Sequence, residues 1–452
     1  MTPDSGNGAE DPVEPLGCPP RSFGAPSGPC HGGVKSFDRV EYGRHHEHVI
    51  EHDVRPLVES EYRAAHDLFR AALHMPAATD SAWRRMAPSY ESGRVWGDHI
   101  DGALAGTAMA FPSSVVVPGG AELPAAAVTA VGVRADRTRR GVLTHLMRVQ
   151  LNEAWQDGEA IAMLHASETP IYGRFGYGVA TRARTVRLEK ASAKLREDAP
   201  GGGEVRLVDP ESARELLPGI YRGMPSRAGM ISRPSAWWET RLRRDDPSGE
   251  PIVIAVHRDE SGDDDGFAIW MVHSNDHRFG DGRATLRLLD MCAANSAARC
   301  ELWRFLLGID LIDEIVAIER PLDEPLEWWL TDSRQCRVRD VYDDLWVRPV
   351  DVPAALRGRD YGGSDAVVLE VRDTTLPHNE GRYLVGPDGV ERVEREAQLS
   401  LDVARLTPLL FGEVASSTLA DANLLAVHDP EALPVADALF ATGRDSWCGT
   451  HF

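Results

Sequence analysis

One stretch of the sequence, residues 128–177, constrains the fold more than any other. It begins with a run of β-branched and small residues, Val128–Val133, which is long enough for a buried strand. A basic loop that ends at Gly141 follows, and apolar residues then recur at helical spacing as far as Asp157. A second strand is predicted over 161–166. This order of strand, loop, helix and strand predicts a site that holds phosphates, because the free N–H groups and the positive dipole end of the helix face an anion.

The composition excludes several classes of protein. The net charge of −21, from 70 acidic and 49 basic residues, argues against general affinity for nucleic acid or an anionic membrane, and it suits a cationic substrate. The six cysteines lack metal-ligand and disulfide spacing, which favours a reducing, cytoplasmic setting. No apolar run approaches the ~20 residues that span a bilayer, and no signal peptide is visible.

The chain divides into four regions. Residues 1–46 are rich in Pro, Gly, Ser and acidic residues, so we expect them to be disordered. A mixed α/β domain is predicted over 47–190. The order of its helices and strands repeats in a second domain over 203–344, and an α+β domain over 345–452 closes the chain.

Four histidines lie where the first folded domain begins: His45, His46, His48 and His52. A metal could bind such a group, but the sequence offers no fixed scaffold or carboxylate partner for it. We therefore interpret these residues as a solvated cluster and expect no metal.

The run that follows the second strand carries a resemblance to a known family. It reads Ser167-Glu168-Thr169-Pro170-Ile171-Tyr172-Gly173-Arg174-Phe175-Gly176-Tyr177-Gly178. With the preceding strand and loop, it resembles the enhanced intracellular survival (Eis) family of GNAT N-acetyltransferases. The residues Thr138–Leu143 align with the family's pyrophosphate loop, R/Q-x-x-G-x-G/A, and share its central glycine. A leucine in last place is normal in that family, whereas Thr138 replaces a basic residue.

The resemblance extends over about 47 to 452 and implies an α/β (α+β) fold. We expect two tandem GNAT-like mixed-sheet domains followed by a sterol-carrier-protein-like α+β domain. In the second GNAT-like domain the junction Ala294-Asn295-Ser296 has neither glycine nor arginine. We therefore expect that domain to lack a phosphate loop and to wall the substrate cleft.

The activity that the resemblance implies is transfer of acetyl from acetyl-coenzyme A to a primary amine. The acceptor would be an aminoglycoside, a polyamine-like amine or a lysine. The implied coenzyme contacts are Val131, Gly132, Val133, Arg139, Arg140, Gly141, Val142, Leu143, Thr144, Ser167 and Glu168.

Two residues take catalytic roles by the same resemblance. Tyr172 would be the general acid, since a phenol with a pKa of about 10 stays protonated at neutral pH. The base would be the α-carboxylate of the terminal residue, Phe452, folded back into the first domain. We interpret His145 and His165 as structural residues, because one lies in the helix of the phosphate loop and the other in a strand.

The family also implies a homo-oligomer, expected to be a hexamer, and neither nucleic acid nor membrane is an expected partner. Two other functions stay open. One is a catalytically inactive GNAT scaffold, which would fail to bind the coenzyme. The other is a protein that binds a lipid or small molecule through its last domain, which would retain acyl chains on purification.

Overall fold

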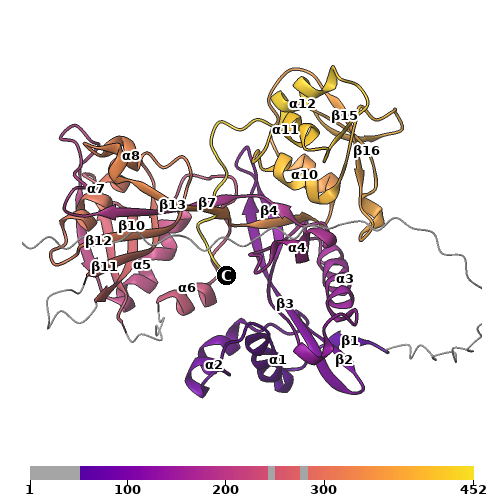
Figure 1. Cartoon of the computed structure of the whole chain (residues 1–452), viewed down its shortest axis with the longest axis horizontal. Helices are drawn as coiled ribbons and strands as arrows, with labels where there is room; N and C mark the ends of the chain where they lie inside the picture. The colour runs from indigo at the N-terminus through magenta and orange to yellow at the C-terminus, as the bar shows by residue number, and fades with distance from the viewer. Residues whose placement is uncertain (1–50, 243–249, 275–282) are drawn as a thin grey trace, which may run out of the picture. The chain divides into compact units, whose positions relative to one another are not determined.

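The computed structural model describes residues 51–242, 250–274 and 283–452, which form one compact unit (Figure 1). The predicted disordered segment 1–46 and His48 lie outside the described residues. No helix in the described part of the chain is both long and apolar enough to cross a bilayer.

The first sheet has seven strands and carries helices on both faces. Successive strand residues point to opposite faces, so in one strand Val95 packs toward α1 and Trp96 toward α3. In sheet order the strands are β1 (Asp53–Pro56), β2 (Val95–Ile100), β3 (Ala103–Val116), β4 (Glu122–Val133), β5 (Ile161–Leu164), β14 (Trp346–Pro349) and β6 (Gly178–Val179). The helices are α1 (Glu59–Ala72), α2 (Asp80–Met86), α3 (Val142–Gln156) and α4 (Thr169–Tyr172).

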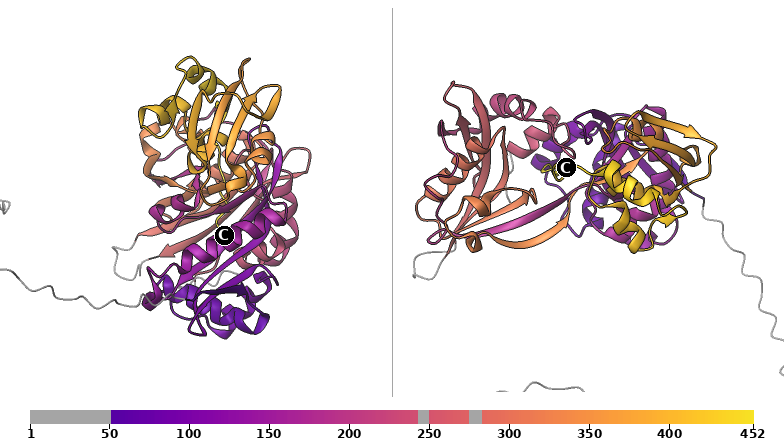
Figure 2. Two further views of the ribbon diagram at one scale, coloured as in Figure 1. Left: turned by 90° about the vertical axis from the view of Figure 1, so that its right-hand side faces the viewer. Right: turned by 90° about the horizontal axis from the view of Figure 1, so that it is seen from above.

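The second sheet also has seven strands, with α5 and α6 on one face and α7 on the other (Figures 1 and 2). In sheet order its strands are β13 (Arg337–Asp343), β7 (Arg182–Glu189), β12 (Glu314–Arg320), β11 (Ala284–Ala293), β10 (Asp264–Ser274), β9 (Val253–Arg258) and β8 (Glu204–Val208). The helices are α5 (Pro210–Arg222), α6 (Ser235–Leu242), α7 (Ser296–Gly308) and α8 (Leu326–Trp329).

The two sheets exchange strands. β7, which lies inside the predicted first domain, pairs with β12 and β13 of the second sheet. β14, which lies in the predicted last domain, inserts between β5 and β6 of the first sheet. The domain boundaries predicted at 190 and 344 therefore do not coincide with the edges of the sheets.

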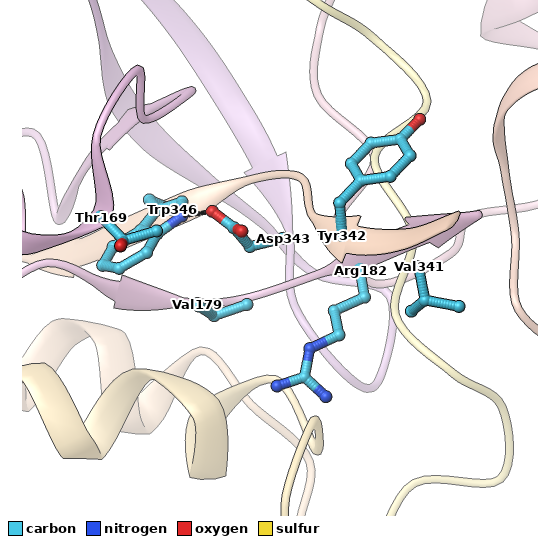
Figure 3. A pocket seen from close by; sticks show the side chains of 7 residues that line it. All are labelled: Thr169, Val179, Arg182, Val341, Tyr342, Asp343 and Trp346. Atoms are coloured by element: carbon cyan, nitrogen blue, oxygen red, sulfur yellow. Dashed lines mark hydrogen bonds between the residues drawn. The ribbon is translucent and has the colours of Figure 1, made fainter. Parts of the chain in front are cut away.

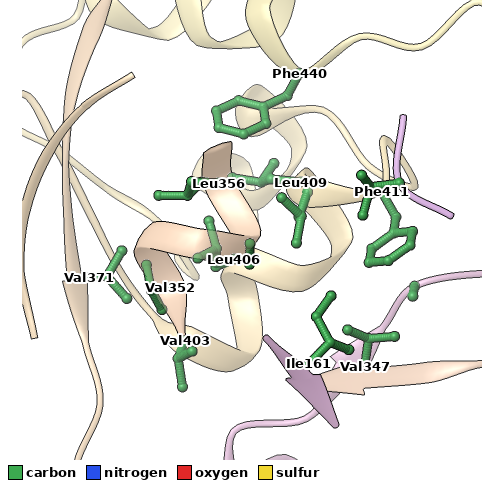
Figure 4. Close-up of a cluster of buried hydrophobic side chains, with 14 of the residues drawn as sticks. Ile161, Val347, Val352, Leu356, Val371, Val403, Leu406, Leu409, Phe411 and Phe440 are labelled. Atoms are coloured by element: carbon green, nitrogen blue, oxygen red, sulfur yellow. The ribbon is translucent and has the colours of Figure 1, made fainter. Parts of the chain in front are cut away.

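The third sheet has five strands and shares a core with the first. Figure 4 shows Ile161 and Val347 of the first sheet packed near Leu406 and Phe411, and all four side chains are buried. In sheet order the strands are β17 (Gly389–Val393), β16 (Gly381–Gly386), β15 (Val367–Arg372), β18 (Leu399–Asp402) and β19 (Ala426–Val427). The helices are α9 (Val352–Arg357), α10 (Val403–Leu410), α11 (Ser416–Asp421) and α12 (Ala432–Phe440).

Candidate active site

The predicted phosphate loop ends in a helix start that is open to an anion. Gly141 has φ +90° and is the N-cap of α3, and no side chain caps the helix there. The first N–H groups of α3, from Val142 to Thr144, are therefore not satisfied by a capping side chain. Arg139 and Arg140 precede the helix and are exposed. This arrangement fits the pyrophosphate of a coenzyme, which would gain the helix dipole as well as the arginine charges.

Two histidines, His52 and His145, lie next to the predicted phosphate loop. His52 Nδ1 lies 2.7 Å from Asp98 Oδ2, and its Nε2 lies 3.0 Å from the carbonyl oxygen of Arg140. The His145 ring is 4.1 Å from the His52 ring. Ligand atoms of His52, Asp98 and His145 lie within 4.8 Å of one another, a spacing that a metal ion could bridge. The prediction that the protein uses no metal stays a prediction.

A bulge bends β4 just before the loop. Thr107 is opposite Gly132 and Met109 is opposite Thr129, so β4 contains one residue more than β3 here. Ala130 absorbs the extra length with φ +51°. β4 pairs with β5 only over residues 125–127, so no described strand pairs with Val131–Val133 on the β5 side. The backbone groups on that side are free to bind the amides of a coenzyme arm.

Tyr172 ends α4, the short helix after β5, and its ring is buried. The ring centroid lies 6.0 Å from that of Tyr177 in an edge-to-face arrangement. Burial raises the pKa of Tyr172, and a hydrogen bond with Ser167 opposes that shift. The phenol therefore stays protonated at neutral pH. Ser167 and Glu168, the predicted coenzyme contacts before α4, are exposed.

The C-terminal segment is fixed along its last six residues. The N–H of Trp447 donates to the carbonyl of Ala228 at 2.7 Å, and the indole of Trp237 donates to the carbonyl of His451 at 2.8 Å. The chain ends with the Phe452 ring 5.5 Å from that of Phe111 and 4.9 Å from that of His165. No direct contact joins Phe452 to Tyr172 among the described residues.

One arginine of the second domain makes two hydrogen bonds to this segment. Arg233 donates from Nε to the hydroxyl oxygen of Thr450 at 2.9 Å and from Nη2 to the carbonyl of Gly449 at 3.0 Å. Nη1 donates to Asp290 at 2.8 Å, and both side chains are buried. The guanidinium lies 4.0 Å from the Tyr221 ring centroid and 4.4 Å from that of Trp237. Sequence reasoning missed Arg233, because no local motif connects it to the chain end.

His165 of the first domain and Asp344, which lies between β13 and β14, also hold the segment. His165 Nε2 lies 3.0 Å from the carbonyl of Thr450, and Nδ1 lies 3.0 Å from the carbonyl of Asp344. Burial lowers the pKa of His165 to about 4. A neutral imidazole carries one N–H, so it can donate to only one of these two carbonyl oxygens, and the structural role of His165 stays a prediction. Burial raises the pKa of Asp344 to about 7, although an N–H of Gly449 donates to it.

The start of α7 in the second domain differs from that of α3. The Asn295 side chain caps α7 by accepting from the N–H of Ala298 at 2.9 Å. The neighbouring pocket between the ends of β11 and β12 is lined by Arg299, Arg320 and Trp447 among others. An internal cap and bulky side chains therefore occupy the place that the phosphate loop takes in the first domain.

A pocket of about 470 Å³ lies where the two sheets exchange strands. Figure 3 shows two of its lining residues, Arg182 and Tyr342, with side chains that extend in opposite directions. It is lined by Thr169, Val179, Arg182, Val341, Tyr342, Asp343 and Trp346. Neither Tyr172 nor Phe452 lines it. Thr169 lines the pocket and directly follows Glu168, a predicted coenzyme contact. The pocket therefore adjoins the candidate site at Thr169.

Comparisons with known proteins give the same order of domains. Models described as acetyltransferase (GNAT) domain match residues 53–180 and 229–349, and a sterol carrier protein domain matches 352–449. An uncharacterized N-acetyltransferase of Streptomyces avermitilis is 35% identical over 419 residues, which cover 88% of this chain and 98% of that protein.

Two Eis proteins are also similar. N-acetyltransferase Eis of Mycobacterium tuberculosis strain H37Ra is 34% identical over 376 residues, or 80% of this chain and 89% of that protein. The crystal structure of Eis1 from Mycobacterium abscessus matches with a TM-score of 0.80 at 35% identity, and the match covers 89% of this chain and 100% of that one. These findings confirm the predicted fold class, two GNAT-like domains followed by a sterol-carrier-protein-like domain.

Proposed function

The chain belongs to the Eis family of GNAT N-acetyltransferases, and from this we propose that Tyr172 and Phe452 carry its acetyl transfer to a primary amine. The protein is an N-acetyltransferase, and its fold implies acetyl-coenzyme A as co-substrate. The assignment of Phe452 rests on the way in which the chain end is held. Supporting it are the burial of the terminal segment from Trp447 to Thr450 and its hydrogen bonds to both acetyltransferase-like domains, which would hold the Phe452 carboxylate in place.

To become an amide nitrogen, the ammonium must lose two protons, and one proton must reach the departing sulfur. An alkyl ammonium with a pKa of about 10.4 must lose a proton before its nitrogen can attack the thioester carbonyl. The Phe452 carboxylate would accept that proton, directly or through a water. Tyr172 would donate its phenolic proton to the sulfur as the carbon–sulfur bond breaks. The nitrogen of the tetrahedral intermediate loses its second proton to solvent as the amide forms. Of the two protons that leave the nitrogen, one restores Tyr172 through solvent and the other is released.

The coenzyme supplies the activated thioester, and the chain supplies the surfaces that hold it. The backbone of Val131–Val133 would pair with the amides of the pantetheine arm. The loop and helix start, Arg139–Thr144, would hold the pyrophosphate, with Ser167 and Glu168 on the opposite side of the site. The open edge of β4 and the uncapped start of α3 support this assignment.

The acceptor that suits this chain is a cationic amine, such as an aminoglycoside, a polyamine or a lysine side chain. The formal charge of −21 attracts cations over distance. Side chains such as Leu406, Phe411 and Phe440 fill the interior of the third domain, which argues against the alternative of a lipid carrier. We further propose a homohexamer in the cytoplasm.

The test is a screen of purified protein with acetyl-coenzyme A and a panel of amines. Release of free thiol would be followed, and the products would be weighed by mass spectrometry. We expect thiol release that depends on the amine and a product that has gained one acetyl group. If no amine in the panel is acetylated and calorimetry shows no coenzyme binding, the alternative of an inactive scaffold is favoured.

A further inference from the structure

The small pocket of the second domain, between the ends of β11 and β12, has a basic lining. It has a volume of about 50 Å³, and four arginines line it: Arg227, Arg299, Arg320 and Arg444. Among the residues that the structure describes, no aspartate or glutamate belongs to the lining. The chain as a whole has a net charge of −21, so this concentration of positive charge runs against its composition.

Two carboxylates next to the pocket compensate only part of this charge. Arg320 forms a buried ion pair with Glu324, in which Nη2 lies 2.7 Å from Oε1. Arg227 and Arg444 share the carboxylate of Asp323, at 2.6 Å and 3.3 Å. Three of the four arginines therefore have two acidic partners between them.

The fourth arginine, Arg299, forms no ion pair with any residue in the described part of the chain. It lies in the first turns of α7 and is partly buried, and its Nη2 donates to the carbonyl of Ala293 at 3.2 Å. Burial lowers the pKa of Arg299, against the opposing charge of Glu324. The charges of Arg320 and Arg444 lower it further. Most N–H groups of this guanidinium thus remain available to a ligand.

These features suit an oxyanion. A planar guanidinium group donates in pairs to the oxygens of a phosphate. Four arginines and two carboxylates leave an excess of two positive charges, which a dianion would balance. One water molecule needs about 10–15 Å³ of such space, so a pocket of about 50 Å³ has room for an ion with four oxygens.

We propose that this pocket binds a phosphate dianion, either as the free ion or as the phosphoryl group of a larger molecule. The site differs from the phosphate loop of the first domain, where backbone N–H groups at the start of α3 would hold the coenzyme. Here the Asn295 side chain caps α7, and arginine side chains would supply the donors instead. The proposal is independent of acetyl transfer.

A bound phosphate would also strengthen the attachment of the chain end. Trp447, which begins the C-terminal segment, and the preceding Arg444 both line the pocket. Arg227 already holds this part of the chain, because its Nε donates to the carbonyl of Asp445 at 2.9 Å. A phosphate shared by Arg299 and Arg444 would add a link to α7. Binding should therefore raise the Tm of the protein.

Calorimetry with inorganic phosphate tests the proposal, in chloride buffers of constant ionic strength. We expect Arg299→Gln to raise the Kd for phosphate by about tenfold or more, because a charge-assisted contact is lost. Arg287→Gln is the matched control, since it removes the same charge from an exposed position of β11. Gly141→Glu blocks the loop of the first domain, so phosphate binding that persists in this variant belongs to the second domain.

Further measurements keep the result unambiguous. Unchanged binding of coenzyme A by Arg299→Gln would show that the variant is folded, and Arg299→Lys, which keeps the charge without the fork, should give an intermediate Kd. Phosphate should raise the Tm of the wild type and not that of Arg299→Gln.

Glycerol 3-phosphate distinguishes the two sources of the anion. Binding of this ester would show that the phosphoryl group of a larger molecule reaches the pocket, whereas binding of inorganic phosphate alone would assign the site to the free ion. The proposal would be overturned if the wild type bound no phosphate, or if Arg299→Gln and Arg287→Gln weakened binding equally. Loss of phosphate binding in Gly141→Glu would also overturn it.

Discussion

Arg233 and Thr450 are 217 positions apart in the chain, and a hydrogen bond of 2.9 Å joins the Arg233 Nε to the Thr450 hydroxyl oxygen. The same guanidinium binds Gly449 and Asp290, so the second domain holds the segment that ends in the proposed base. The domain without a phosphate loop therefore contributes to the candidate site by positioning the end of the chain.

Replacing Arg233 should affect turnover more than coenzyme binding. Arg233→Lys keeps the charge but loses the fork that contacts Thr450, Gly449 and Asp290 together. We expect kcat to fall at least tenfold, with the Kd for coenzyme A unchanged in calorimetry. Arg222→Lys, at an exposed position at the end of α5, is the matched control. Loss of coenzyme binding in the Arg233 variant would point to a general structural role instead.

The free carboxylate of Phe452 should be required for activity. Residues added after Phe452 move the charge, and deletion of Phe452 leaves the new terminus about 3.5 Å short along the chain. We expect both changes to lower kcat/KM by about 10²-fold or more, whereas the same tag at the N-terminus leaves it unchanged. Phe452→Leu should retain part of the rate, because it keeps an apolar anchor and the carboxylate. Wild-type rates from the extended or shortened chain would refute the chain-end base.

The Tyr172 hydroxyl can be tested against that of its neighbour. Tyr172→Phe should lower kcat by about 10²-fold with little change in coenzyme affinity. Tyr177→Phe removes a hydroxyl that is fully buried and has no hydrogen-bond partner in the described structure, so its kcat should match the wild type. Steady-state kinetics of the two variants decide the assignment, and equal rates in both would remove Tyr172 from the mechanism.

The two ends of α3 provide a paired test of the phosphate loop. Gly141→Glu places bulk and negative charge where the pyrophosphate would lie, and it should abolish coenzyme binding in calorimetry. Gly158→Glu changes another left-handed glycine, φ +77°, at the far end of the same helix. The backbone strain is similar there, so retained binding in this variant would attribute the first loss to the loop itself. Coenzyme binding by Gly141→Glu would contradict the assignment.

Asp344 should make stability depend on pH. Burial raises its pKa from 3.8 to about 7, against a hydrogen bond from the Gly449 N–H. Between these values the folded state holds a proton that the unfolded state has lost, so the contribution of this carboxyl to the free energy of unfolding falls as pH rises. Asp344→Asn should therefore gain stability relative to the wild type between about pH 4 and pH 7. Urea unfolding across that range checks this, and a constant difference between the two proteins would argue against it.

Local patterns in the sequence predicted many elements well. The helix predicted between Gly141 and Asp157 is α3, and the strand predicted over 161–166 is β5, Ile161–Leu164. Alternating or helical apolar spacing encodes such elements within a few residues. The order of the domains was predicted from the resemblance to the family, and that resemblance rests mainly on the motif around Tyr172.

Features that depend on distant contacts could not be predicted in the same way. No local pattern indicates that β7 joins the second sheet or that β14 returns to the first. The left-handed residue Ala130 is not glycine, so the bulge in β4 leaves no signal that marks it. The contacts of Arg233 with Thr450 and Gly449 likewise form only when the chain end folds back, so no local pattern indicates them.

The exchange of β7 and β14 has a consequence for how this chain can be divided. Each acetyltransferase-like half completes its sheet with a strand from beyond its own sequence repeat, so neither half is an independent unit of folding. A fragment that stops near residue 190 would lack β14 and leave the edge of β5 unpaired, with the third domain's share of the common core missing as well. Exchange of one half for another would therefore also require β7 or β14, because each sheet depends on one of these strands.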